Sequence, residues 1–155
     1  PQGENREHPI KFPAKQKFYQ DLSTHLQNSF NADSLVALVG DINISEQDID
    51  IGIGEKNAKR WLQTGKCSFL PEERVMLQEL KQSIIGGLHD SYRKHHPHSN
   101  ELSWFDYRSR GFNDNPKRGL RIDQIMLSRK LIDECIGAGI DYTVRSMEKP
   151  SDHAP

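Results

Sequence analysis

The sequence predicts an α/β or α+β domain, because segments with helical periodicity alternate along the chain with short apolar runs of strand length. The chain has 155 residues, of which 34% are apolar and 28% are charged, as in a soluble, surface-rich domain. No apolar run approaches the roughly 18 residues of a membrane-spanning helix. We therefore expect one domain and no membrane partner.

A helix and a strand are the first predicted elements. Residues 12–30 carry Phe18, Leu22 and Leu26 at i, i+4 and i+8, which predicts one apolar helix face. Residues 34–40, SLVALVG, are a continuous apolar run that predicts a strand buried on both sides.

Two further helices are predicted in the middle of the chain. A short one is expected near residues 56–62. A longer one begins at Pro71, because the fixed φ of proline suits a first helical turn. Val75, Met76 and Leu80 are expected to form its buried face.

Strand patterns dominate the last third of the chain. In residues 103–109, SWFDYRS, alternation places Trp104 and Phe105 on opposite faces. Residues 118–128, RGLRIDQIMLS, predict a second strand. Residues 137–146, GAGIDYTVRS, predict a last strand before a terminal loop.

The overall charge does not indicate a class of partner. Basic and acidic residues nearly cancel, 21 against 22, but phosphate contacts need only a local basic face. Cys67 and Cys135 are far apart and lack the spacing of a metal site, which favours two reduced thiols and a cytoplasmic location. The first residues lack the apolar core of a secretory signal.

The stretch GDINIS is the first candidate for chemistry. Asp41 and Asn43 stand two residues apart just after an apolar strand, so an extended backbone would point both side chains to one side. A carboxylate and an amide that converge there can hold a water and a divalent metal or a phosphate oxygen. The alternative is an ordinary turn, since Gly, Asp and Asn are common turn formers.

The stretches GLRID and SDHAP supply a second candidate pair. Asp123 lies in an apolar strand, where a buried carboxylate needs a partner. His153 is the candidate partner, because a carboxylate that accepts from one imidazole nitrogen fixes the tautomer and favours the protonated ring. The alternatives are an edge-strand charge and a terminal histidine that both face water.

Several words of the sequence, in order along the chain, resemble the bacterial exonuclease III family of abasic-site endonucleases, within the endonuclease/exonuclease/phosphatase superfamily. These words are PQGENREHPIKFPAKQKFYQDL, GDINIS, DIDIGIG, KRWLQTGKCSFLPEER, SWFDYRSRGF, GLRID and RSMEKPSDHAP. The resemblance implies a four-layered, DNase I-like α/β sandwich of two mixed sheets with helices outside. It identifies residues 1–155 as the C-terminal portion of one such domain, which we expect to have little activity without the rest.

The resemblance also implies an activity and a partner. The family hydrolyses DNA phosphodiesters 5′ to abasic sites, with 3′–5′ exonuclease and 3′-phosphatase action. We therefore expect Mg²⁺ as cofactor, with Mn²⁺ as the alternative ion, and double-stranded DNA with abasic sites or 3′ ends as substrate. A monomer in the cytoplasm is expected.

Site residues are implied by matching motif to motif. Asp41 matches the acid/base aspartate of the family and Asn43 its neighbouring asparagine. Asp123 matches the aspartate that orients the catalytic histidine, here His153. The implied metal ligands are Asp152, Asp41 and Asn43.

A substrate pocket is implied in the same way. Trp104, Leu120 and Ile122 match the pocket that receives the flipped-out abasic sugar. Phe105 is a further candidate, because alternation places Trp104 and Phe105 on opposite faces and one of the two can line a groove for a base or sugar. An apolar pocket suits this substrate, since an abasic nucleotide has no base to unstack.

Other readings remain open from the motifs. A DNase I-like nuclease or a phosphoinositide phosphatase shares the Asp-x-Asn and Asp-His pattern. A DNA-binding module or fragment without catalysis is a third reading, and salt-sensitive DNA binding without turnover would distinguish it.

Overall fold

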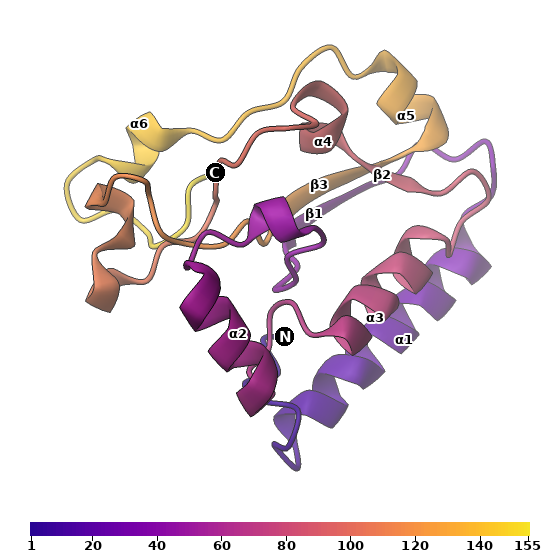
Figure 1. Cartoon of the computed structure of the whole chain (residues 1–155). Helices are drawn as coiled ribbons and strands as arrows, with labels where there is room; N and C mark the ends of the chain where they lie inside the picture. The colour runs from indigo at the N-terminus through magenta and orange to yellow at the C-terminus, as the bar shows by residue number, and fades with distance from the viewer.

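The computed structural model describes residues 1–155 and contains one antiparallel sheet with the strand order β1–β3–β2 (Figure 1). The strands are β1 (Ala37–Asp41), β2 (Leu88–Asp90) and β3 (Asp123–Ser128). The helices are α1 (Lys11–Ser29), α2 (Glu55–Thr64), α3 (Pro71–Lys81), α4 (Ser91–His95), α5 (Arg129–Glu134) and α6 (Tyr142–Arg145). Short 3₁₀ turns cover Asp48–Asp50, Tyr107–Ser109 and Gly111–Asn113. The α/β class is confirmed.

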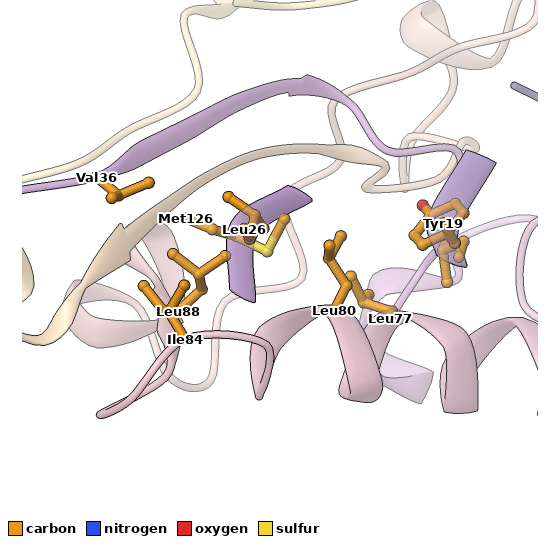
Figure 2. Close-up of a cluster of buried hydrophobic side chains, with 9 residues drawn as sticks. Tyr19, Leu26, Val36, Leu77, Leu80, Ile84, Leu88 and Met126 are labelled. Carbon is orange, nitrogen blue, oxygen red and sulfur yellow. The ribbon is translucent and has the colours of Figure 1, made fainter. Parts of the chain in front are cut away.

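Two layers make up the main body of the fold. The helices α1 and α3 lie side by side against one face of the sheet (Figure 1). Between these helices and the sheet lies the main apolar core, which Figure 2 shows in close-up. Its buried members are Tyr19, Leu26, Val36, Ile44, Leu77, Leu80, Ile84, Leu88 and Met126. Of the four layers in the sandwich that the resemblance implied, this chain therefore contains one sheet and one main helical layer.

Each of the two long helices exposes one residue of its predicted apolar face. In α1 the side chains of Phe12, Lys15, Tyr19 and Leu26 are buried, whereas Phe18 is 47% exposed. Leu26 is buried and Leu22 packs against the main apolar core, as predicted, so only the Phe18 position of the expected face is wrong. In α3, Leu80 is buried and Met76 packs against the same core, as predicted, whereas Val75, an expected core residue, is 55% exposed.

The strand β1 is covered on one face only, so the prediction of burial on both sides was wrong. Successive residues of β1 alternate between exposed and half-buried, and Val39 is 63% exposed. The exposed face of β1 continues across the sheet into Ile125 and Leu127 of β3. Together these side chains form part of the floor of an apolar groove of about 820 Å³.

Two of the predicted C-terminal strands are not present. The stretch from residue 137 to 146 contains α6, because the Asp141 side chain accepts hydrogen bonds from Thr143 N and Val144 N and so begins a helix. Around Trp104, single antiparallel bridges to Leu120 and His153 replace the expected strand. None of the helices combines the length and apolar character needed to span a bilayer.

A buried ion pair joins the helical layer to the loop after β1. The Lys15 and Glu73 side chains are 0% exposed, and Lys15 Nζ lies 2.6 Å from Glu73 Oε1. Lys15 Nζ also donates to the backbone carbonyl of Asn43 at 2.9 Å. The other oxygen of Glu73 accepts from Ser68 N and Leu70 N at the start of α3. The charges are thus paired and hydrogen-bonded, as buried charges must be.

This ion pair generates a prediction about stability. Replacing Lys15 with Met leaves Glu73 buried without its cation, so we expect Lys15→Met to lower the free energy of unfolding by about 3–5 kcal/mol. Lys17→Met in the same helix removes an exposed pair with Asp21 and should change it by less than about 0.5 kcal/mol. Urea denaturation measures both variants. Equal, small losses would show that the buried pair contributes little.

Candidate active site

The pairing of β1 with β3 brings two aspartates together at the end of the sheet. In this register Asp41 lies directly opposite Asp123, three pairs along from Leu38 and Met126. Residues directly opposite in an antiparallel pair project to the same face, so the two carboxylates share the face that carries the apolar groove. The sequence suggested that Asp123 lies in the interior of its strand, but it is the first residue of β3.

Asn43 reaches Asp41 through a tight turn. Its backbone has a φ of 54°, a left-handed conformation that asparagine adopts more readily than most residues. Asn43 N donates to Asp41 Oδ1 at 2.8 Å, and Asn43 Nδ2 donates to Asp41 Oδ2 at 2.6 Å. The turn and the convergence of the two side chains are therefore both present, but an extended backbone is not their cause.

His153 is hydrogen-bonded to Asp123, as expected. Its Nδ1 lies 3.0 Å from Asp123 Oδ1 and 2.9 Å from Asp123 Oδ2. A carboxylate at Nδ1 holds the imidazole in one orientation and leaves Nε2 for other contacts.

Ser103 fixes both members of this pair. Its buried hydroxyl accepts hydrogen bonds from Ile122 N and Asp123 N, each at 3.0 Å. Its backbone carbonyl accepts from Ala154 N at 2.7 Å, next to His153. One residue thereby anchors the start of β3 and the C-terminal segment, which are 30 residues apart in sequence.

The environment of Asp41 favours its protonated form. Partial burial raises the pKa of Asp41 above its ordinary value of 3.8, and the charge of Asp123 opposite raises it further. Hydrogen bonds from Asn43 and the positive charge of His153 oppose this rise. A shift in this direction makes a carboxyl easier to protonate, which general acid–base catalysis can use.

The environment of His153 favours its charged form. The hydrogen bond to Asp123 raises the pKa of His153 above 6.5, although partial burial acts in the opposite direction. The negative charges of Asp123, Asp41 and Asp152 add to the rise, in that order. The site therefore combines a histidine whose charged form is favoured with a carboxyl whose neutral form is favoured.

The oxygen donors for a metal ion are only partly assembled. No group of three or more His, Cys, Asp or Glu side chains lies close enough together to hold one. Asp41 and Asn43 converge, whereas Asp152 Oδ2 accepts a hydrogen bond from Trp104 Nε1 at 3.0 Å. Mg²⁺ commonly takes one or two carboxylates and completes its shell with waters and substrate phosphates, and the Asp41–Asn43 pair fits that mode.

Three of the four predicted pocket residues do not line an open pocket. Phe105, Leu120 and Ile122 are 0%, 1% and 4% exposed. They are enclosed because Phe105 packs in one small apolar cluster, and Leu120 and Ile122 pack around Phe69 in another.

Trp104, the fourth predicted pocket residue, is only half-buried. It lines a cleft of about 260 Å³ that also contains Arg60 and Arg118. Of the four predicted residues, only the indole can therefore meet a substrate directly.

Sequence reasoning missed the residues that hold the site in place. Lys15 follows Phe12 and precedes Tyr19 at helical spacing, and this signal could have identified a lysine that faces the core. Arg121 is 1% exposed and pairs with Asp50 and Asp90. In the sequence, the burial of Arg121 is indicated only by its position between the apolar residues Leu120 and Ile122.

Comparison with known proteins assigns the chain to a family. The model of the Endonuclease/Exonuclease/phosphatase family matches residues 3–153, and the chain belongs to this family. Exodeoxyribonuclease III of Haemophilus influenzae is 56% identical over the whole chain, which spans 57% of the length of that relative. The prediction that the chain corresponds to the C-terminal part of such a protein stays a prediction.

Solved structures share the fold. A 3′ phosphatase from Neisseria, bound to its product DNA hairpin, is 31% identical and superposes with a TM-score of 0.84. An AP endonuclease from Archaeoglobus fulgidus is 27% identical and superposes with a TM-score of 0.85. Each match covers 99% of this chain, and 55% and 56% of the respective structures.

The charge pattern of the site generates a prediction about pH. Asp123→Asn should lower the pKa of His153 more than Asp41→Asn does, because Asp123 contributes both a hydrogen bond and a charge. A histidine whose folded pKa exceeds its unfolded value of 6.5 stabilises the fold fully below about pH 6.5. This contribution is lost as the pH rises through the folded pKa.

Two-dimensional NMR titration of the imidazole signals measures the pKa of His153 in the three proteins. Urea denaturation across the same pH range then measures the stability difference between the wild type and Asp123→Asn. If His153 titrated at the same pH in all three, the assigned hydrogen bond would not influence it.

Proposed function

We propose that the protein hydrolyses DNA phosphodiester bonds in a metal-dependent reaction. The proposed actions are incision 5′ to abasic sites, 3′–5′ exonuclease action and 3′-phosphatase action. The observation that carries the proposal is the hydrogen-bonded Asp123–His153 pair beside Asp41. The names of the relatives, an exodeoxyribonuclease III, an AP endonuclease and a 3′ phosphatase, support this choice among phosphoesterases.

Each polar residue of the site has a proposed role. Asp41 activates the attacking water or protonates the leaving oxygen, and its raised pKa supports either role. His153 acts as an imidazolium that stabilises negative charge on the phosphoryl oxygens. Asp123 keeps that ring charged and oriented, and Asn43 orients the carboxylate of Asp41.

A divalent cation is the proposed cofactor. Asp41 and Asn43 would hold it, with Asp152 as a further candidate, and Mg²⁺ is the proposed ion with Mn²⁺ as the alternative. When bound, the ion would neutralise charge on the phosphate.

The proposed DNA partner is a duplex with an abasic site or a 3′ end. Trp104 would contact the extruded sugar, because its half-buried indole lies beside Asp152. Monomeric state and cytoplasmic location stay predictions.

The first prediction from this proposal concerns the polar residues. In the full protein, Asp41→Asn and His153→Ala should each lower turnover of an abasic duplex by at least about 10²-fold, because each removes a group that acts on the reacting phosphate. DNA binding should largely survive. Asp48→Asn is a matched control, since Asp48 is exposed and lies seven residues from Asp41. Near-wild-type rates in either site variant would refute its role.

The second prediction concerns the metal. Chelation with EDTA should abolish turnover, and added Mg²⁺ or Mn²⁺ should restore it. Rates measured on an abasic duplex across a metal titration test this directly. Undiminished turnover in EDTA would refute metal dependence.

Substrate comparison separates the proposed function from its alternatives. Cleavage is measured on abasic duplex, intact duplex and an inositol phosphate. Preference for the abasic duplex or for 3′ ends supports the proposal. Equal cleavage of intact duplex favours a DNase I-like nuclease, and hydrolysis of the inositol phosphate favours a phosphatase.

A further inference from the structure

Arg145 is a buried arginine without an acidic partner. The structure buries two arginines, Arg121 and Arg145, which are 1% and 6% exposed. Arg121 pairs with the carboxylates of Asp50 and Asp90. Arg145 makes no ion pair, and its enclosed Nε has no hydrogen-bond partner. Because a buried cation without a counter-charge is costly, the missing partner of Arg145 needs an explanation.

Aromatic rings account for only part of the environment of Arg145. Its Cζ lies 4.7 Å from the ring centroid of Phe112, 5.6 Å from that of Tyr107 and 5.7 Å from that of Phe105. Such cation–π contacts favour the positive charge, but they provide no acceptor for the N–H donors in the guanidinium plane. The two Nη groups, which are not enclosed as Nε is, therefore remain available to an anion.

A cleft of about 320 Å³ lies against Arg145. At roughly 30 Å³ for each water, this volume holds on the order of ten waters and so has room for a phosphate group. Arg110 lines the same cleft, together with Asn113 and a single carboxylate, that of Asp106. One oxygen of Asp106 already accepts from Arg108 N at 3.0 Å. Two cations against one engaged carboxylate favour an anionic ligand.

The cleft adjoins the candidate active site. Met147 and Pro150 line both this cleft and the groove that contains Asp123 and His153. The hydroxyl of Tyr107 donates to the carbonyl of Pro150, which fixes the wall between the two spaces. The stretch from residue 106 to 118 carries four cations and two carboxylates, so the surface nearby is locally basic despite the balanced total.

We propose that the cleft between Arg145 and Arg110 binds a phosphate group of a nucleic-acid backbone, one that does not itself react. That the phosphate belongs to a nucleic acid rests on the proposed function; that it is a phosphate anion rests on the unpartnered guanidinium. Arg145 supplies fixed N–H donors, and a planar guanidinium matches phosphate geometry.

The first arm of the test titrates inorganic phosphate into the full protein. The ¹⁵N–¹H signal of Arg145 Nε, assigned by through-bond correlation to the Arg145 backbone, is expected to shift with phosphate and not with equal ionic strength of chloride. An Nε signal that did not respond to phosphate would overturn the anion site.

The second arm measures how DNA affinity depends on salt, without divalent metal. Arg145→Met should reduce the slope of log K against log salt by about 0.9, which corresponds to one lost phosphate contact on duplex DNA. Arg129→Met removes an exposed arginine in α5, at the other end of the molecule from α6, and should leave the slope unchanged (Figure 1). An unchanged slope in a folded Arg145→Met would overturn the DNA contact.

A third variant separates charge from packing. Arg145→Lys keeps the charge but not the planar donors, so it should retain the salt slope that Arg145→Met loses, because counterion release depends on the charge. If neither variant folds, the phosphate titration of the wild type still decides the anion site. DNA cleavage with no phosphate response would refute this anion site and leave the proposed function standing. A phosphate response without DNA binding would support the anion site and refute the proposed function.

Discussion

The register of the β1–β3 pair is the constraint on which the candidate site depends. Asp41 and Asp123 face each other because the two strands pair residue for residue from Ala37–Leu127 onward. Side chains alternate between faces along a strand, so a slip by one residue would turn one carboxylate into the helical layer. There it would meet the apolar core instead of His153, and the cost of burying it would oppose the slip.

The helical layer controls the position of the site loop as well as the core. Lys15 holds the carbonyl of Asn43, and the hydroxyl of Tyr19 donates to the carbonyl of Ile42 at 2.5 Å. Both side chains come from one face of α1, so the helix fixes the backbone at Ile42 and Asn43, within the turn that carries the Asp41–Asn43 contact. The buried Lys15–Glu73 pair therefore positions the backbone of the candidate site in addition to its effect on the stability of the fold.

The sequence predicted the polar site better than the packing around it. The pairing of Asp123 with His153 followed from the need of a strand carboxylate for a partner. The exposed face of β1 did not follow, because the apolar run around Val39 reads the same whether one side of the strand is covered or both. Local capping by Asp141 overrode a strand pattern. The burial of Lys15 was not predicted, because its partner, Glu73, is 58 residues away.

The position of Trp104 gives the protein an internal optical reporter. Its indole N–H bonds Asp152, the neighbour of His153, while its ring borders the cleft with Arg60 and Arg118. The other tryptophan, Trp61, stacks on Phe69 with the rings 5.6 Å apart and lines the same cleft. Occupation of the site would alter the polarity around Trp104, which bonds Asp152, and around Trp61 in the same cleft. The fluorescence emission of the protein would therefore respond to events beside the Asp123–His153 pair without any added label.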